Sequence, residues 1–229
     1  MHANPYLRER IVLSLDLETC PLESDEVRAE IADSIKPSAA MSKPETIAAW
    51  ERDRKPALVE EAFARGGLSA TTGRIACIGI VHGTSEKTWC GDDEAELLHL
   101  CYEYLGMLGE PVTYVGQNLV GFDLPFLRQR SIIHRRKPPL SLRKAMAAKP
   151  WEEQVVADTM LLWSHDRDKR ISLDKLCRLL GIPSPKADGM DGSQVWPLWQ
   201  AGERQRIADY CLADCRAALA CYQRIMEVA

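Results

Sequence analysis

The chain has 229 residues and a formal net charge of −4, and apolar residues make up 46% of it and charged residues 27%. A chain of this length and composition buries a core of its own, which excludes a largely disordered protein. Its longest apolar run, Ile75 to Val81, is far shorter than the ~20 residues of a membrane span. The N-terminal residues lack the apolar stretch of a secretory signal, so we expect neither a membrane-bound nor an exported protein.

Eight cysteines lie along the chain, and no two of them form a C-x-x-C pair. A structural zinc site is therefore not expected. Several cysteines lie in apolar stretches, where a thiol packs as a small apolar group. Free thiols of this kind are typical of a reducing compartment, and the sequence predicts a cytoplasmic protein.

Strand and helix patterns alternate along the chain. Runs of apolar residues predict strands at 11–17, 74–82, 88–90, 112–115 and 155–157. Apolar residues at helical spacing predict helices at 94–108, 124–133, 172–180 and 203–227. Ser172 is a plausible N-cap, and Gly181 is a plausible stop for the same helix. This mixture indicates an α/β domain with a mixed sheet.

A helical insertion is expected at 20–72, between the first two strands. Ser42 with Glu45 three residues later fits a capping box that would start one helix. Pro56 would break this helix, and a second helix would run to Ala64. The insertion has few apolar residues for a core of its own, so we expect a single domain over 1–229.

Two acids end the first predicted strand. Because side chains alternate along a strand, Asp16 and Glu18 point to the same face. Inside a domain they would repel each other and lose hydration, and a divalent cation would remove both costs. The alternative is a strand end that emerges into water, where acids cost little.

A second acid signal follows the strand at 112–115. Asp123 stands where a glycine-containing turn gives way to a helix, and it could serve simply as the N-cap of that helix. Its neighbour Phe122 could be a core residue, or it could offer a stacking face to a base.

The last predicted helix carries Tyr210 and Asp214 one turn apart on its apolar stripe. A buried aspartate needs a partner, which could be an arginine or a metal ion already held by Asp16 and Glu18. Tyr210 could hold a water near that ion, or it could be a core tyrosine whose hydroxyl reaches a partner.

Together these segments resemble the DEDD superfamily of 3′–5′ exonucleases, in its tyrosine subclass. The resemblance extends over about residues 10–225 and is closest to stand-alone predicted exonucleases related to the proofreading domain of B-type DNA polymerases. The matching segments are Asp16-Leu17-Glu18-Thr19, Asn118-Leu119-Val120-Gly121-Phe122-Asp123 and Tyr210-Cys211-Leu212-Ala213-Asp214. Asp209 stands five residues before Asp214, and no histidine is near, which favours the tyrosine subclass.

The resemblance implies a ribonuclease-H-like fold with a mixed five-stranded sheet flanked by helices. It implies two divalent cations, Mg²⁺ or Mn²⁺, with Tyr210 orienting the attacking water. It also implies that Thr19 and Asn118 bind the 3′-terminal nucleotide, and that nucleoside 5′-monophosphates are released. The metal ligands that it implies are Asp16, Glu18, Asp123 and Asp214. Asp158, outside these segments, could support the metal ligands or serve as a helix N-cap, and the N-cap is the favoured interpretation.

Positive charge is concentrated at 128–149, where eight Lys and Arg stand without an acid and leave −12 for the rest of the chain. This segment could form a cationic approach to an acidic centre, or a solvated surface. The sequence predicts cleavage of nucleic acid, with single-stranded DNA favoured over RNA. We expect any role in replication or repair to depend on a protein partner.

Two other functions fit the sequence less well. A module that binds strand ends without cutting them would also use the cationic segment, but it would not need all four acids. A nucleotide-dependent α/β enzyme is disfavoured because the sequence has neither G-x-G-x-x-G nor G-x-x-x-x-G-K-[ST].

Overall fold

The computed structural model describes residues 9–149, 151–165, 169–186 and 189–228. It divides the chain into two compact units, one made of Met1–Glu18 with Ile75–Ala229 and the other of Thr19–Arg74. The first unit contains the four predicted metal ligands, and the second contains the predicted helical insertion. The single-domain organisation of 1–229 stays a prediction.

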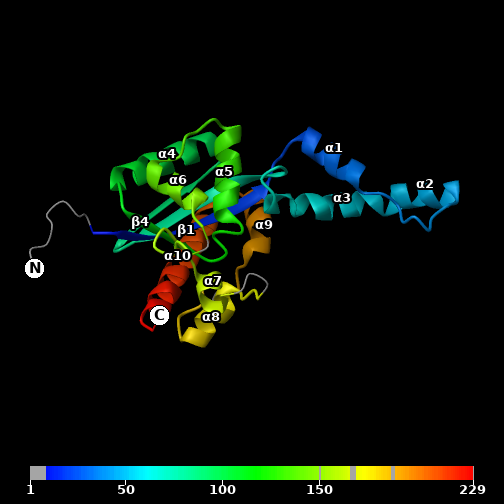
Figure 1. The fold of residues 1–229 in the computed structure, drawn as a ribbon. Helices are drawn as coiled ribbons and strands as arrows, with labels where there is room; N and C mark the ends of the chain where they lie inside the picture. The colour runs from blue at the N-terminus through cyan, green and yellow to red at the C-terminus, as the bar shows by residue number, and fades with distance from the viewer. Residues whose placement is uncertain (1–8, 150, 166–168, 187–188, 229) are drawn as a thin grey trace, which may run out of the picture. The chain divides into compact units, whose positions relative to one another are not determined.

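The first unit is built on a mixed five-stranded sheet in the order β3-β2-β1-β4-β5 (Figure 1). β1 and β4 pair in parallel with Ile11 opposite Val112, and β4 and β5 are also parallel, whereas β2 and β3 are antiparallel. The strands are β1 Ile11–Pro21, β2 Gly73–His82, β3 Ser85–Cys90, β4 Val112–Gly116 and β5 Val156–Asp158. All five predicted strands are confirmed, and β3 begins earlier than expected because it pairs with β2 from the turn onward.

Helices cover both faces of the sheet. In Figure 1, α4, α5 and α6 lie on one side of it and α10 lies on the other, where it packs against β3 and β4. The helices of this unit are α4 Glu94–Leu108, α5 Asp123–Ile133, α6 Leu140–Ala147, α7 Thr159–Ser164, α8 Leu173–Leu180, α9 Val195–Gln200 and α10 Arg204–Met226. The predicted fold class, an α/β mixed sheet flanked by helices, is confirmed.

A glycine lets α10 approach the sheet closely. A Cβ atom on Gly79 of β2 would lie 2.7 Å from Sγ of Cys211 and 3.1 Å from Sγ of Cys215, both on α10. Cys215 belongs to a buried cluster with Val115 and Leu219. The cysteines therefore pack as small apolar side chains, and they set the distance between β2 and the helix that carries Tyr210 and Asp214.

Helix ends follow the sequence signals in part. The hydroxyl of Ser172 accepts a hydrogen bond from N of Lys175 at 3.3 Å, and Gly181 ends α8 with φ of +69°, both as predicted. The short helices α6 and α9 were not predicted, and of α7 only the N-cap at Asp158 was. α8 is as short as α6, but its cap at Ser172 and its stop at Gly181 marked it in the sequence.

The second unit contains three helices, α1 Asp25–Ser34, α2 Pro44–Asp53 and α3 Lys55–Ala64. The predicted capping box at Ser42 is wrong, because Lys43 is the N-cap of α2 and its side chain makes no capping bond. Pro44 starts the helix instead, since its fixed φ suits the first turn and it has no N–H to satisfy. The break near Pro56 and the end at Ala64 are confirmed, whereas α1 was not predicted.

None of the helices in the described part of the chain combines the length and the apolar character that a membrane crossing requires.

Candidate active site

The end of β1 presents two acids to α10. Leu15 and Leu17 are buried on the opposite face, so Asp16 and Glu18 point together toward the helix. The thiol of Cys211 on α10 donates a hydrogen bond to O of Asp16 at 3.4 Å. Single ligand atoms of Asp16, Glu18 and Cys211 all lie within 4.8 Å of one another. The alternative of a strand end in water is therefore wrong for Glu18, which is only 6% exposed.

Asp123 joins this pair from the first turn of α5. Its Oδ1 accepts a hydrogen bond from N of Leu17 at 3.1 Å, across the 106 residues that separate the two in the sequence. The N-cap position belongs to Phe122, so the interpretation of Asp123 as an N-cap is wrong. The Asp123 side chain is turned into the protein toward β1, where it is 4% exposed.

Tyr210 and Asp214 complete the group from α10. The buried Tyr210 hydroxyl donates a hydrogen bond to the carboxylate of Asp214 one turn later, which works to lower the pKa of that acid. Asp214 is half-buried, and its negative charge raises the pKa of both Glu18 and Asp123. Three segments remote in sequence thus bring four acids and one tyrosine to a single place.

The acids strongly oppose one another's ionisation. Burial, reinforced by the charges of the neighbouring acids, raises the pKa of Asp16 and of Glu18 well above the ordinary carboxyl range. Burial also raises the pKa of Asp123, although the hydrogen bond from Leu17 opposes this shift. The pKa of Asp214 rises to about 6, again mainly through burial, with the hydrogen bond from Tyr210 and the charge of Lys186 working against it.

The donor set fits a hard divalent cation. Oδ2 of Asp16 is buried and has no hydrogen-bond partner. Within the described ranges, no lysine or arginine forms an ion pair with Asp16, Glu18, Asp123 or Asp214. The alternative of an arginine partner for Asp214 is therefore not observed. Carboxylate oxygens are the ligands that Mg²⁺ and Mn²⁺ prefer, and a cation would satisfy the orphaned oxygen.

The turn before α5 is held in place by Asp158. Its Oδ1 accepts from N of Asn118 at 3.0 Å and its Oδ2 accepts from N of Val120 at 3.0 Å. Oδ1 also accepts from N of Met160, which confirms the predicted N-cap. The bonds to the 118–120 turn were not predicted, because no local pattern relates Asp158 to a turn about 40 residues earlier.

The predicted substrate-binding residues lie in different places. Asn118 is in this turn with φ of +58°, and its side chain lies against Gly121, where a Cβ atom would be 2.4 Å from Oδ1 of Asn118. Phe122 is half-buried, and its ring lies 5.5 Å from that of Phe126. Thr19 belongs to the other unit, where its hydroxyl donates a hydrogen bond to O of Gly67 at 2.6 Å.

Comparison with known proteins points to one family. The fold is similar to that of the family B DNA polymerase from the hyperthermophilic archaeon Pyrobaculum calidifontis, with a TM-score of 0.59 and 13% sequence identity. The similarity covers 98% of this chain but only 25% of the polymerase chain, so the protein corresponds in length to a fraction of that enzyme. No curated protein matches the chain. Residues 72–229 match the model of a family described as predicted 3′–5′ exonucleases related to the exonuclease domain of PolB, and the chain belongs to this family.

Proposed function

We propose that the protein is a metal-dependent 3′–5′ exonuclease that acts on nucleic acid, preferentially single-stranded DNA, and releases nucleoside 5′-monophosphates. The convergence of Asp16, Glu18, Asp123 and Asp214 around an orphaned carboxylate oxygen carries this proposal. The matched family range includes Asp123 and Asp214, whereas Asp16 and Glu18 precede it and rest on the geometry.

The four acids would hold two divalent cations, Mg²⁺ or Mn²⁺. Such cations, when bound, supply activation of a water nucleophile and stabilisation of charge on the leaving 3′ oxygen. The chain itself contributes the placement of the acids. β1 fixes Asp16 and Glu18 on one face, and the hydrogen bond from Leu17 ties Asp123 to the same strand.

Tyr210 is suited to orient the attacking water. Burial and the charge of Asp214 raise the pKa of its phenol above the ordinary value, so the hydroxyl keeps its proton at neutral pH. A protonated phenol that already donates to Asp214 has lone pairs left to accept from a water. We therefore propose that Tyr210 positions the attacking water and does not act as a general base.

Contacts to the terminal nucleotide are proposed for Phe122, Asn118 and Thr19. The half-buried ring of Phe122, the residue before Asp123, offers a stacking surface to a base. The hydrogen bond from N of Asn118 to Asp158 fixes the turn that leads into α5, where Asp123 is the first residue. We also propose a cytoplasmic location, on the basis of the eight thiols, and a protein partner for any role in replication or repair.

The test uses 5′-labelled single strands of DNA and RNA of one sequence, incubated with Mg²⁺ or Mn²⁺. We expect a ladder that shortens from the 3′ end, with DNA cut faster than RNA. Asp16→Asn, which keeps the shape of the side chain, should abolish the ladder. Equal digestion by this variant would overturn the proposal. Stable binding in EDTA without turnover in metal would favour the end-binding module, and faster cutting of RNA would identify an exoribonuclease.

A further inference from the structure

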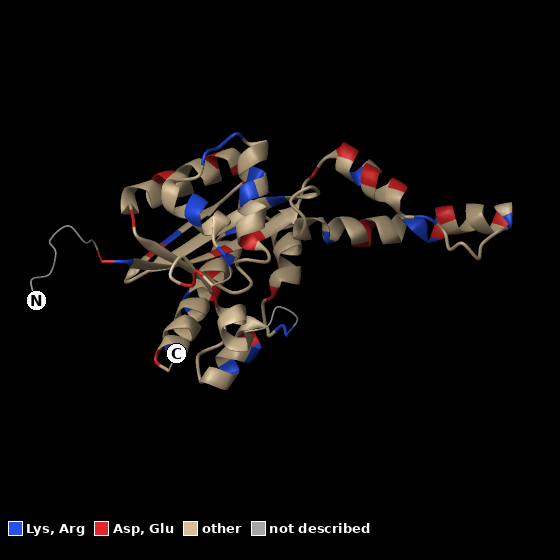
Figure 2. Ribbon diagram, in the orientation of Figure 1, with Lys and Arg blue, Asp and Glu red and all other residues tan. Residues whose placement is uncertain are grey.

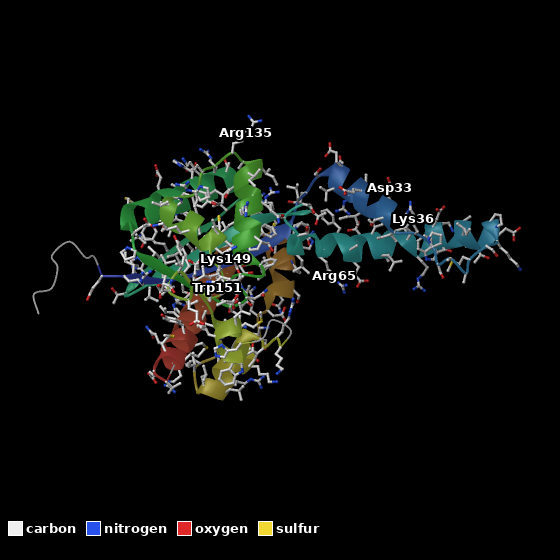
Figure 3. All side chains as sticks on the ribbon, viewed as in Figure 1. Asp33, Lys36, Arg65, Arg135, Lys149 and Trp151 are labelled. Carbon is white, nitrogen blue, oxygen red and sulfur yellow. The ribbon has the colours of Figure 1, made fainter. Side chains whose placement is uncertain are left out.

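The segment 128–149, which includes part of α5 and all of α6, carries exposed positive charge. Two cations of the 128–149 segment are paired: Arg130 is buried against Glu94, and Lys144 contacts Glu110 at 2.9 Å. Six others are exposed and have no ion pair among the described residues, namely Arg128, Arg135, Arg136, Lys137, Arg143 and Lys149. Figure 2 shows the turn between α5 and α6 in blue, and in Figure 3 Arg135 extends outward from that turn.

Five of these cations line one cavity. Its volume is about 530 Å³, and Ile132 and Met146 supply its apolar part. The cationic lining residues are Arg128, Arg135, Arg136, Lys137 and Arg143. We call this cavity the basic groove. Its lining combines cationic and apolar side chains, which suits a ligand that has both anionic groups and apolar surface.

The basic groove continues toward the acids. A second cavity of about 320 Å³ shares Arg128, Ile132 and Met146 with it. This second cavity is also lined by Leu124 and Pro125, which directly follow Asp123 in α5. An extended ligand in the basic groove can therefore follow α5 to the helix end where Asp123 contributes to the acidic cluster.

The inner face of α5 is fixed by contacts that do not involve the exposed cations of the groove. Nε and Nη2 of Arg130 donate to the two carboxylate oxygens of Glu94 at 2.8 and 2.6 Å. The hydroxyls of Ser131 and Tyr102 lie 2.6 Å apart in a buried hydrogen bond. Neutralising the exposed cations of the groove should therefore leave the helix and Asp123 in place.

We propose that the basic groove binds the phosphodiester backbone of the strand whose 3′ end lies at the acids. This inference rests on the proposed exonuclease function. It names the surface that binds the part of the substrate distant from the scissile bond. Since the rest of the chain sums to −12, a polyanion needs such a surface to approach the acidic cluster. Backbone phosphates supply the regular negative charge, and sugars and bases supply apolar surface for Ile132 and Met146.

The test measures binding without cleavage. A triple variant, Arg135→Ala, Arg136→Ala and Arg143→Ala, is compared with the wild type in EDTA by fluorescence anisotropy of a labelled 20-nucleotide strand. The matched control removes three exposed cations outside the 128–149 segment that also have no ion pair among the described residues, by Lys36→Ala, Lys87→Ala and Lys175→Ala. We expect Kd to rise at least about tenfold in the groove variant and less than about twofold in the control.

Salt dependence gives a second readout. Each phosphate contact on a single strand contributes about 0.7 to the slope of log Kd against log salt concentration. Loss of three contacts should therefore lower this slope by about 2 in the groove variant, with DNA and RNA strands affected alike. An unchanged slope, an equal loss in the control variant, or no binding by the wild type would overturn the proposal.

Hydrolysis separates this inference from the proposed function. A dinucleotide is too short to extend from the acids into the groove, so the groove variant should cut it as fast as the wild type does. On the 20-nucleotide strand, kcat/KM should fall at least about tenfold, mainly through KM. Equal losses on both substrates would overturn the groove as a backbone site. Absence of any hydrolysis by the wild type would overturn the proposed function, whereas the anisotropy measurements would still decide the groove.

Discussion

The backbone N–H of Leu17 donates a hydrogen bond to Oδ1 of Asp123 at 3.1 Å, and this bond links the end of β1 to the start of α5. Leu17 stands between Asp16 and Glu18 in the strand. The bond therefore fixes Asp123 relative to both acids of the strand at once.

Asp123→Asn separates this structural bond from the charge. The amide keeps an oxygen that can accept from Leu17, so the fold should persist, and removal of one of several opposing buried charges should raise the midpoint of thermal unfolding in EDTA at pH 8. Activity should fall at least about 100-fold, since even changes to residues that only support metal ligands cost 10–100-fold. Differential scanning calorimetry and a strand-cleavage assay would check both parts. A variant that is less stable and still active would contradict the assignment.

Tyr210→Phe removes the hydroxyl that donates to Asp214 and is proposed to orient water. We expect kcat to fall about 100-fold or more, in line with the loss of one positioned hydrogen-bonding group, with little change in the affinity for Mn²⁺. Tyr222→Phe on the same helix is the control, because Tyr222 packs against the apolar cluster around Leu219. Similar kcat values for the two variants would exclude a special role for Tyr210.

The free energy of unfolding should fall as the pH rises, whereas most carboxylates in proteins stabilise the fold as they ionise. The pKa of Asp214 in the folded protein is about 6, whereas an unfolded aspartate titrates near pH 3.9. Between these values the folded protein binds more protons than the unfolded chain, so the free energy of unfolding falls as the pH rises from about 4 through about 6. Urea denaturation in EDTA should show this decline, and Asp214→Asn should flatten it.

Addition of Mn²⁺ should reverse this decline in the free energy of unfolding, because the proposed cations would bind the ionised acids of the folded protein. At a hundredfold excess over its Kd, one bound cation adds about 2.7 kcal/mol to the free energy of unfolding. No stabilisation by Mn²⁺ at pH 8 would contradict a metal site at these acids.

Gly79→Ala should lower the free energy of unfolding, although Gly79 has no side chain that could take part in catalysis. The new Cβ atom would meet Sγ of Cys211 at 2.7 Å, so α10 must shift, and overpacking of this kind costs about 1–3 kcal/mol. Activity should fall too, because α10 carries Tyr210 and Asp214. Gly106→Ala in α4 is the control: apart from its chain neighbours and its own helix backbone, no atom lies within 4 Å of its Cβ position, and we expect a gain of up to about 1 kcal/mol. Chemical denaturation of both variants would check this difference.

Asp158→Ala should loosen the turn before α5. The buried carboxylate accepts from N of Asn118, Val120 and Met160, and loss of these charge-assisted bonds should cost about 3 kcal/mol. Asp158→Asn keeps an oxygen for two of the three donors and should recover part of the stability and the activity. Equal stability of the alanine and asparagine variants would show that the carboxylate does not hold the turn.

Local patterns in the sequence predicted much of this architecture. The strand with Asp16 and Glu18, the helix with Tyr210 and Asp214, and the cap at Ser172 depend on neighbours within a few residues, and the structure contains them all. Contacts between remote segments were harder to predict. Whether Asp123 caps its helix or accepts a hydrogen bond from Leu17 depends on a strand more than a hundred residues away. The hydrogen bonds from the 118–120 turn to Asp158 likewise join segments that are about 40 residues apart.

Charge counting had a similar limit. All eight cations of the 128–149 segment look alike in the sequence, but Arg130 is 4% exposed and contacts the carboxylate of Glu94. Its position relative to α4 separates it from its exposed neighbours, and only tertiary structure supplies that information. The same carboxylate also accepts from N of Ile75 and contacts His134 at 2.8 Å, which a count of charges does not reveal.

The buried contact between Arg130 and Glu94 has a consequence for how the proposed activity could diversify. It secures α5 from within, so the outward side of the helix is free to change while Asp123 stays bonded to β1. Substrate preference and bond breaking would then be separable traits. Selection, or a protein engineer, could exchange residues along the outer rim to favour other polymers or lengths without rebuilding the centre that cuts them.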